Sequence, residues 1–423
     1  MQDKNIDIKL HKILKKSLKS LCLLYAIVTT FAVANFPVMK FAYFFGITRD
    51  SAVIMRSFVF FIAIIILFYF AFKNIGSLKS FLSWNTFFRS IWVSIFLLIL
   101  VSTLKVAYMG EVYANISLSP FDQDIGFFYR RILEPALAYF LQLKGEVLYG
   151  IFHFLITFSC IYLIIAWLEK KLFVKLRIWQ LVSIMTAGII INQFQSPGYP
   201  EPLILLMALI SLFIPLNKYG RISILALMFL THESAALFLG LVFSWFYFPK
   251  EERKYYVLLP LLFYLLWLAN YGFSFTNLFL GHLTLTNGNA LSLFLKNISN
   301  IGLPIFFAYK FLWFFVIFSL YDYLKQKKYK SFIRIATIII VPLALIVIPD
   351  TSRVIAWGSI GVFLAVAHSY KYLRSRMFNL ILMANLILPS VAVGIGSGGP
   401  VSYAGLYGFF IDLFKLFVKN YLM

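Results

Sequence analysis

The chain has 423 residues, of which 62% are hydrophobic and only 13% are charged. A soluble domain cannot bury this proportion of apolar side chains, whereas repeated long apolar runs are typical of transmembrane helices, so the composition excludes a soluble globular protein. The formal net charge is +22. Most Lys and Arg residues nevertheless lie in short connections between apolar runs. This placement is typical of charges that orient helices in a membrane and contact anionic lipid, and it argues against nucleic-acid binding. Cys22 and Cys160 both fall within apolar runs, so the sequence predicts neither a disulfide framework nor a cysteine metal site.

The apolar runs predict an all-α fold, namely a polytopic integral membrane protein with about 11–14 transmembrane helices. Several runs are shorter than the roughly 17 residues that cross a bilayer alone, and these are expected to form short or broken helical hairpins that line a cavity. The whole chain, 1–423, is interpreted as a single transmembrane domain. The predicted apolar segments are 19–37, 53–72, 89–109, 147–168, 178–192, 201–216, 222–231, 234–248, 255–271, 301–320, 332–349, 354–369 and 377–395, with a last stretch at 404–420.

The basic connections predict the orientation. If 178–192 with 201–216 and 222–231 with 234–248 are hairpins, all the main basic connections fall on one side, which the positive-inside rule makes cytoplasmic together with the N-terminus. The other side then carries a large external loop with interfacial helices, 110–146, and a second external segment, 272–300. The basic connections are the N-terminal tail, 73–89, 170–177, 218–221, 250–254, 325–334 and 371–376.

Four polar clusters fall on the predicted external side. Each ionisable group is costly to keep near a membrane, so the clusters are candidates for a functional site. They are FDQD to YRRILEP at 121–135, NQFQSPGYPEP at 192–202, THES at 231–234 and PDTSR at 349–353.

Asp122 and Asp124 of the first cluster are separated by one residue. Two carboxylates at this spacing can hold a divalent cation, or one can act as a general base while the other positions it. The alternative is a solvated loop in which one Asp caps a helix that begins near Gly126.

Arg130 and Arg131 follow at the start of a predicted interfacial helix. Arginine binds phosphate through two parallel hydrogen bonds and keeps its charge at a membrane surface, although anchoring to lipid headgroups is the alternative. Glu134 comes one helical turn after Arg130 and could pair with it.

The second and third clusters supply further polar groups. Gln193 can hydrogen-bond sugar hydroxyls, and Glu201 either does the same or caps the next helix. His232 and Glu233 lie between two apolar runs, where they need partners or water. Their alternative role is a buried pair that shapes the hairpin.

Asp350 and Arg353 flank the break between two predicted spans. They either form a local ion pair or helix cap, or provide a second phosphate-binding arginine that faces the first loop. The sequence has no Walker loop, no dinucleotide-binding glycine motif and no nucleophile elbow, so an ATP-driven or nicotinamide-dependent function is not expected.

This arrangement resembles the GT-C class of membrane glycosyltransferases and related bacterial polytopic membrane proteins. Asp122 and Asp124 match the acidic motif that those enzymes carry in an early external loop, and YRRILEPALAYFL is similar to the arginine-then-proline segment after it. THES and DTSR resemble the later polar breaks. In this chain the acidic loop follows the third predicted span instead of the first, which indicates two added helices or a related but different class.

The resemblance implies transfer of a sugar from a polyprenyl-phosphate-linked donor to a glycan, lipid or protein acceptor on the extracytoplasmic face of the bacterial inner membrane. The roles it implies are a base at Asp122 or Asp124, phosphate binding by Arg130, Arg131 and Arg353, and ordering of the sugar or acceptor by His232 and Glu233. Mg or Mn could bind the acidic pair. A polysaccharide polymerase, a lipid-linked oligosaccharide flippase or transporter, and a structural membrane partner are the alternatives.

The orientation can be tested by accessibility of single introduced cysteines to a membrane-impermeant thiol reagent. Positions in 250–254, 325–330 and 371–376 should be labelled only after the membrane is opened, whereas positions in 121–135 should be labelled in intact cells. Labelling of position 325 from outside would contradict the predicted hairpins and separate the polar clusters.

Overall fold

The protein is described by a computed structural model. Its backbone is described in residues 2–35, 46–73, 82–101, 108–122, 131–172, 174–195, 197–213, 216–246, 249–269, 301–343, 354–394, 399–402, 405–409 and 412. Several predicted features therefore lie outside the described residues. They are Asp124, Arg130, Asp350, Arg353 and the external segment 272–300.

The described part of the chain is helical apart from one short pair of strands, which agrees with the predicted α-helical membrane protein. Five helical segments are long and apolar enough to cross a membrane, and the larger predicted number of spans stays a prediction. They are Ile13–Val33 within α1 (Gln2–Asn35), α3 (Arg49–Phe72), α4 (Trp84–Val101), α7 (Glu146–Leu172), and Gly302–Lys325, which comprises α16 (Gly302–Tyr309), η6 (Lys310–Leu312) and α17 (Trp313–Lys325).

Shorter helices make up most of the remainder, and several pack against the long ones. They are α5 (Tyr108–Leu118), α6 (Leu133–Phe140), α8 (Ile178–Met185), α9 (Ile189–Gln195), α10 (Glu201–Phe213), α11 (Lys218–Thr231), α12 (Glu233–Phe246), η3 (Lys250–Glu252), α13 (Arg253–Ala269), α18 (Tyr329–Leu343), η7 (Ala356–Gly358), α20 (Ser359–Tyr372) and α21 (Ser375–Ile387). The predicted span 377–395 ends as a helix at Ile387, before Pro389, and continues into strand β1 (Ala392–Gly394), which pairs antiparallel with β2 (Gly399–Ser402).

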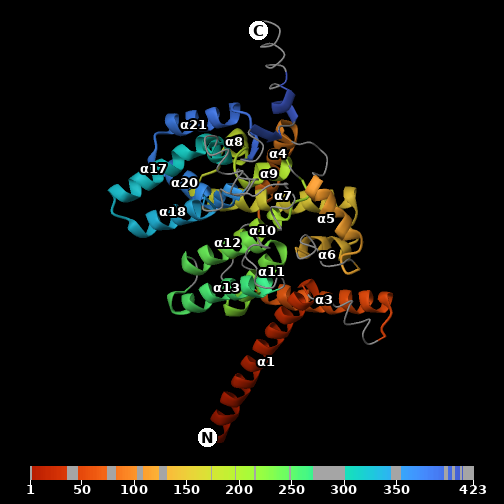
Figure 1. Ribbon diagram of the computed structural model, residues 1–423. Helices are drawn as coiled ribbons and strands as arrows, with labels where there is room; N and C mark the ends of the chain where they lie inside the picture. The colour runs from red at the N-terminus through yellow and green to blue at the C-terminus, as the bar shows by residue number, and fades with distance from the viewer. Residues whose placement is uncertain are drawn as a thin grey trace.

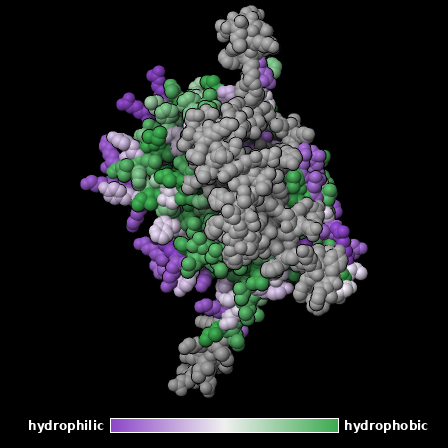
Figure 2. Space-filling model, viewed as in Figure 1, coloured by the Kyte–Doolittle hydropathy of each residue, from purple (hydrophilic) through white to green (hydrophobic). Residues whose placement is uncertain are grey.

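In space, α7 lies near the centre of the molecule and α1 extends away from the other helices, with the N-terminus at its tip (Figure 1). Contacts tie α1 and α11 to α3, α10 to α7, α12 to α13, and α17 to α20. Figure 2 shows hydrophilic side chains along the left edge, beside α17, α18, α12 and α13, with hydrophobic side chains just inside that edge, and further hydrophilic side chains at the right edge beside α5 and α6. Exposed apolar residues such as Phe58 and Leu258 lie on the outer helix faces, as expected for contact with lipid.

The predicted break between 222–231 and 234–248 is confirmed. Helix α11 ends at Thr231 and α12 begins at Glu233, while His232 between them has an extended backbone with φ −162° and ψ 108°. The Asn217 side chain accepts a hydrogen bond from the Gly220 N–H and caps the start of α11. The two helices therefore meet at a histidine and a glutamate.

Two further breaks were not predicted. The apolar run 178–192 divides into α8 and α9 at Gly188, which has φ +75° and no room for a side chain, because an added Cβ would lie 2.4 Å from Ser359 Oγ. The run 301–320 divides at Lys310, which has φ +48°. The buried Lys310 Nζ donates to Asn385 O, Leu388 O, Thr186 Oγ1 and Ser390 Oγ, so one side chain satisfies acceptors on two segments, the end of α8 and the end of α21.

Candidate functional site

A buried ion pair connects the first and third predicted polar clusters. Arg131 precedes α6, and Glu233 is the first residue of α12. Arg131 Nη2 donates to Glu233 Oε1 at 2.6 Å and Arg131 Nε donates to Oε2 at 2.9 Å, which is the parallel two-bond geometry typical of arginine and carboxylate. Both side chains are buried, at 6% and 1% exposed. The interaction therefore joins positions that are 102 residues apart in the sequence.

Tyr113 on α5 extends this pair. Arg131 Nη1 donates to the Tyr113 hydroxyl at 3.4 Å, and the tyrosine is 1% exposed. Burial raises the pKa of the Tyr113 hydroxyl to about 12, although the arginine opposes the shift. The hydroxyl is thus a neutral hydrogen-bonding group at physiological pH.

A second buried pair lies between α6 and α7. Glu134 Oε1 is 3.2 Å from His153 Nδ1, and both residues are buried. Burial raises the pKa of Glu134, and the hydrogen bond to His153 opposes this rise. When Nδ1 donates to the carboxylate, the other ring nitrogen of a neutral histidine carries a lone pair. That nitrogen, Nε2, is buried and makes no hydrogen bond within the described part of the chain.

Glu201 brings the second predicted cluster to the same region. It is the first residue of α10 and 1% exposed, and its charge acts on the titration of both Glu134 and Tyr113. Like charges in a low-dielectric interior repel strongly, so the Glu201 carboxylate disfavours the ionised form of Glu134. Glu134, Glu201 and Glu233, with Arg131, His153 and Tyr113, are called the buried charged cluster below.

Gln193 and His232 are two further predicted site residues, and both are buried. Gln193 lies on α9, which packs on α7, and its Oε1 is buried with no hydrogen bond in the described regions. The ring of His232 lies 5.2 Å from that of Trp357, and its Nδ1 accepts from the Ala235 N–H. Trp357 follows the fourth predicted cluster by a few residues, and the cluster itself, 349–353, lies outside the described residues.

Asp122 has a different environment. Arg49 at the start of α3 donates from Nε to Asp122 Oδ1 at 2.7 Å, and the two side chains are 58% and 37% exposed. This pairing was not predicted, because Arg49 had no assigned role. Asp124, the other candidate base, lies outside the described residues, so the proposed roles of the acidic pair stay predictions.

The described residues give little support for a metal ion at the acidic pair. Within the described ranges, no group of three or more His, Cys, Asp or Glu side chains is arranged to hold one. One oxygen of Asp122 already accepts from the Arg49 guanidinium, which opposes binding of a cation at the same carboxylate. The predicted Mg or Mn therefore enters no step below.

His153, Tyr113 and Arg49 are not among the site residues predicted from the sequence. A signal for His153 was present, because an ionisable residue inside an apolar run needs a partner in the bundle. Its partner could not be identified from spacing, since Glu134 lies in a different helix. Glu134 has a described contact with His153, and its possible pairing with Arg130, which lies outside the described residues, stays a prediction.

Comparison of the chain with models of protein families, with curated proteins and with solved structures gives no match. The functional argument therefore depends on the residues and contacts above.

The ion pair between Arg131 and Glu233 should dominate local stability. Arg131→Met or Glu233→Leu should each lower the free energy of unfolding by about 3–5 kcal/mol, because each leaves a buried charge without its partner. The double variant should lose less than the sum of the two. Arg49→Met, at an exposed pair, is the control and should cost about 0–1 kcal/mol. Denaturant unfolding in detergent measures all four, and strict additivity of the single losses would contradict the pairing.

The Glu134 carboxyl should make stability depend on pH. A carboxyl whose pKa is raised in the folded protein binds a proton more tightly in the folded than in the unfolded state. Its contribution to the free energy of unfolding is therefore complete below the ordinary carboxyl pKa of 4.5 and is lost as the pH rises through the pKa of the folded protein. Glu134→Gln should therefore gain stability relative to wild type as pH increases from about 4.5. Glu252→Gln is the control of opposite sign, because the hydrogen bond from Tyr256 lowers the pKa of Glu252. Parallel pH profiles for wild type and Glu134→Gln would disprove the effect.

Proposed function

We propose that the chain is a membrane glycosyltransferase that moves a sugar from a polyprenyl-phosphate-linked donor to a glycan, lipid or protein acceptor on the extracytoplasmic face. The observation that supports this most strongly is the buried charged cluster, in which Arg131, Glu201 and Glu233 come from three separate predicted clusters. Buried ionisable groups in a membrane protein are costly, and their convergence from distant segments is typical of a site that handles charged substrate groups.

Arg131 is the described group best suited to bind the donor phosphate. Its contact with Tyr113, at 3.4 Å, is longer than its contacts with Glu233, at 2.6 and 2.9 Å, and is the one that a phosphate oxygen would replace. Glu233 would then hold the guanidinium in place while the bond between the sugar and the phosphate oxygen breaks. Arg130 and Arg353 remain the predicted sources of further positive charge.

The base that removes the proton from the acceptor hydroxyl has two candidates. One is the predicted acidic pair, Asp122 or Asp124. The other is His153, whose Nδ1 faces the Glu134 carboxylate and whose Nε2 makes no hydrogen bond in the described part of the chain. A carboxylate that orients a histidine and stabilises its protonated form is an efficient arrangement for proton transfer. We favour His153, because one oxygen of Asp122 is already bound to Arg49.

The remaining polar groups would orient the sugar or the acceptor. Gln193, Glu201 and His232 are buried side chains that can exchange hydrogen bonds with hydroxyl groups. A polysaccharide polymerase would use the same lipid-linked donor chemistry and differs mainly in its acceptor.

A lipid-linked oligosaccharide flippase or transporter is the second candidate, because ionisable groups also lie elsewhere in the interior. Lys310 is fully buried between α16 and α17. The Lys310 side chain, however, donates to Asn385 O, Leu388 O and two hydroxyl groups. These contacts indicate a structural role, in which the lysine stabilises the helix break. The proposed glycosyltransferase therefore accounts for the buried charged cluster better than a flippase or transporter does.

The choice of base can be tested with purified protein in proteoliposomes. A panel of polyprenyl-phosphate donors with radiolabelled sugars is supplied with membrane lipid extract as acceptor, and release of the unsubstituted polyprenyl phosphate is measured. If His153 is the base, His153→Gln should lower turnover by about 10²–10⁴-fold. Asp122→Asn and Asp124→Asn should then stay near wild type, and loss of activity in an Asn variant instead would make that acid the base.

The control is Lys325→Gln, an exposed residue at the end of α17. It should retain full activity, and monodisperse protein in every variant shows that folding is intact. If wild type moves labelled donor across the bilayer without releasing polyprenyl phosphate, the protein is a flippase and the proposed transferase is wrong.

A further inference from the structure

A cavity of about 900 Å³ lies at the opposite end of α7 from the buried charged cluster. Its walls come from the ends of α7 and α20, from α17 and from the start of α18, with one residue of α10. Three of the basic connections predicted to be cytoplasmic, 170–177, 325–334 and 371–376, each contribute to it. The cavity is therefore formed by segments that are distant in the sequence but share one predicted side of the membrane.

The charges around this cavity have one sign. Its described lining includes five cationic side chains and no Asp or Glu. The cations are Lys170, Lys171, Lys328, Arg334 and Lys371. Two acids adjacent in the sequence to lining residues have partners, since Glu169 is ion-paired with Arg89 and Asp322 accepts from His368. The cavity thus presents a surplus of positive charge to any group that enters it.

The lining is also partly apolar and aromatic. Trp167, Leu212, Ile335 and Leu364 provide hydrocarbon surface beside the cations. A free phosphate ion would leave that surface exposed to water, whereas an amphiphilic ligand covers both parts. Aromatic and basic residues together at the end of a transmembrane helix are typical of the membrane interface.

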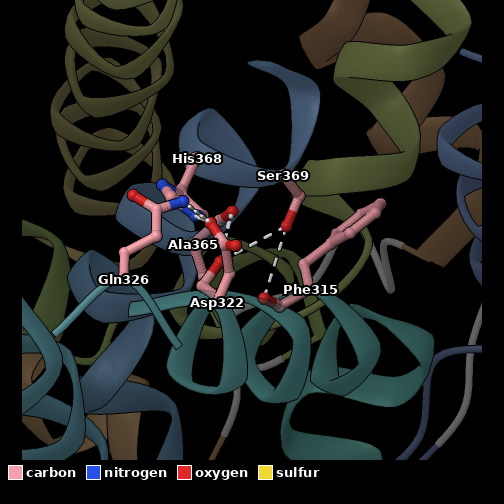
Figure 3. A network of polar contacts seen from close by, with 7 residues as sticks. Phe315, Asp322, Gln326, Ala365, His368 and Ser369 are labelled. Carbon is pink, nitrogen blue, oxygen red and sulfur yellow. Dashed lines mark hydrogen bonds and ion pairs between the residues drawn. The ribbon is translucent and has the colours of Figure 1, made fainter. Parts of the chain in front are cut away.

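Polar contacts between α17 and α20 hold one wall of the cavity in place (Figure 3). His368 Nε2 lies 2.8 Å from Asp322 Oδ2, which also accepts from Gln326 Nε2 at 2.6 Å. The adjacent Ser369 Oγ donates to Phe315 O at 3.3 Å. The ring of His368 lies between those of Tyr323 and Tyr372, at 4.2 and 4.6 Å. A fixed wall lowers the entropic cost of binding a ligand.

We propose that this cavity, called the basic cavity below, binds the headgroup of an anionic phospholipid from the adjacent leaflet. The phosphate would lie among the lysines and Arg334, and the glycerol and first acyl carbons would cover the apolar wall near Trp167. Basic recesses between helices on the cytoplasmic side are suited to phosphate-rich headgroups such as that of cardiolipin. This site is independent of the proposed glycosyl transfer.

The proposal can be tested by native mass spectrometry of the delipidated full-length protein, titrated with cardiolipin, phosphatidylglycerol or phosphatidylcholine. Wild type should retain the two anionic lipids and release phosphatidylcholine. The variant Lys170→Gln/Lys328→Gln/Lys371→Gln should bind cardiolipin about 10- to 100-fold more weakly. The control Lys218→Gln/Lys250→Gln/Lys254→Gln removes the same charge from basic connections that do not line the cavity, and it should bind within about twofold of wild type. Equal losses in both triple variants would show a general surface attraction and overturn the site.

Ser331→Trp tests the volume of the cavity independently of its charge, because the larger side chain fills part of the cavity while all five cations remain. It should weaken cardiolipin binding, and unchanged binding would show that lipid lies elsewhere.

Competition with inorganic pyrophosphate or glycerol phosphate distinguishes the source of the phosphate. Neither should displace cardiolipin at millimolar concentration, and displacement would overturn the lipid assignment in favour of a soluble anion. Thermal unfolding of each variant identifies any loss that is due to misfolding.

Discussion

The ion pair between Arg131 and Glu233 is the contact on which the arrangement of the buried charged cluster depends. Both groups are buried where the effective dielectric constant is low, so neither can lose its partner without a large cost. The pair fixes the start of α6 against the break between α11 and α12. With α6 held there, Glu134 reaches His153 on α7. A single electrostatic constraint thus determines the positions of two acids and one histidine.

The need of buried polar groups for a partner also explains other irregularities of the fold. Arg56, buried in α3, donates to Val33 O and Phe121 O, which ties α1 and the residues after α5 to one guanidinium. Lys310 does the same for carbonyl groups near the end of α21. In a bilayer an unsatisfied backbone carbonyl is expensive, so a helix can end within the bundle only where a donor meets it. In the described part of the chain, the buried Arg56, Arg131 and Lys310 side chains therefore bind groups at helix ends, helix breaks or chain turns.

The helical membrane class and the break at His232 could be predicted from the sequence, because both depend on the length of apolar runs and on polar residues that interrupt them. The pairing of Arg131 with Glu233 could not be predicted, since hydrophobic periodicity identifies which residues are apolar and not which distant helices are neighbours. The break at Lys310 was missed for a related reason. A lysine inside an apolar run gives no indication of the four acceptors that surround it, which come from segments far along the chain.

Helix α7 contributes residues to both polar regions, the buried charged cluster and the basic cavity. His153 and Lys170 are both on this helix, and at a rise of 1.5 Å per residue they are separated by roughly 26 Å, close to the thickness of the hydrocarbon core. The buried charged cluster, with three glutamates, and the basic cavity, with five cations, therefore lie toward opposite ends of α7. One phosphate group cannot occupy both. If α7 crosses the membrane with its two ends at opposite faces, as its length and composition allow, the ligands proposed for the two regions would be different molecules, one from each side of the membrane.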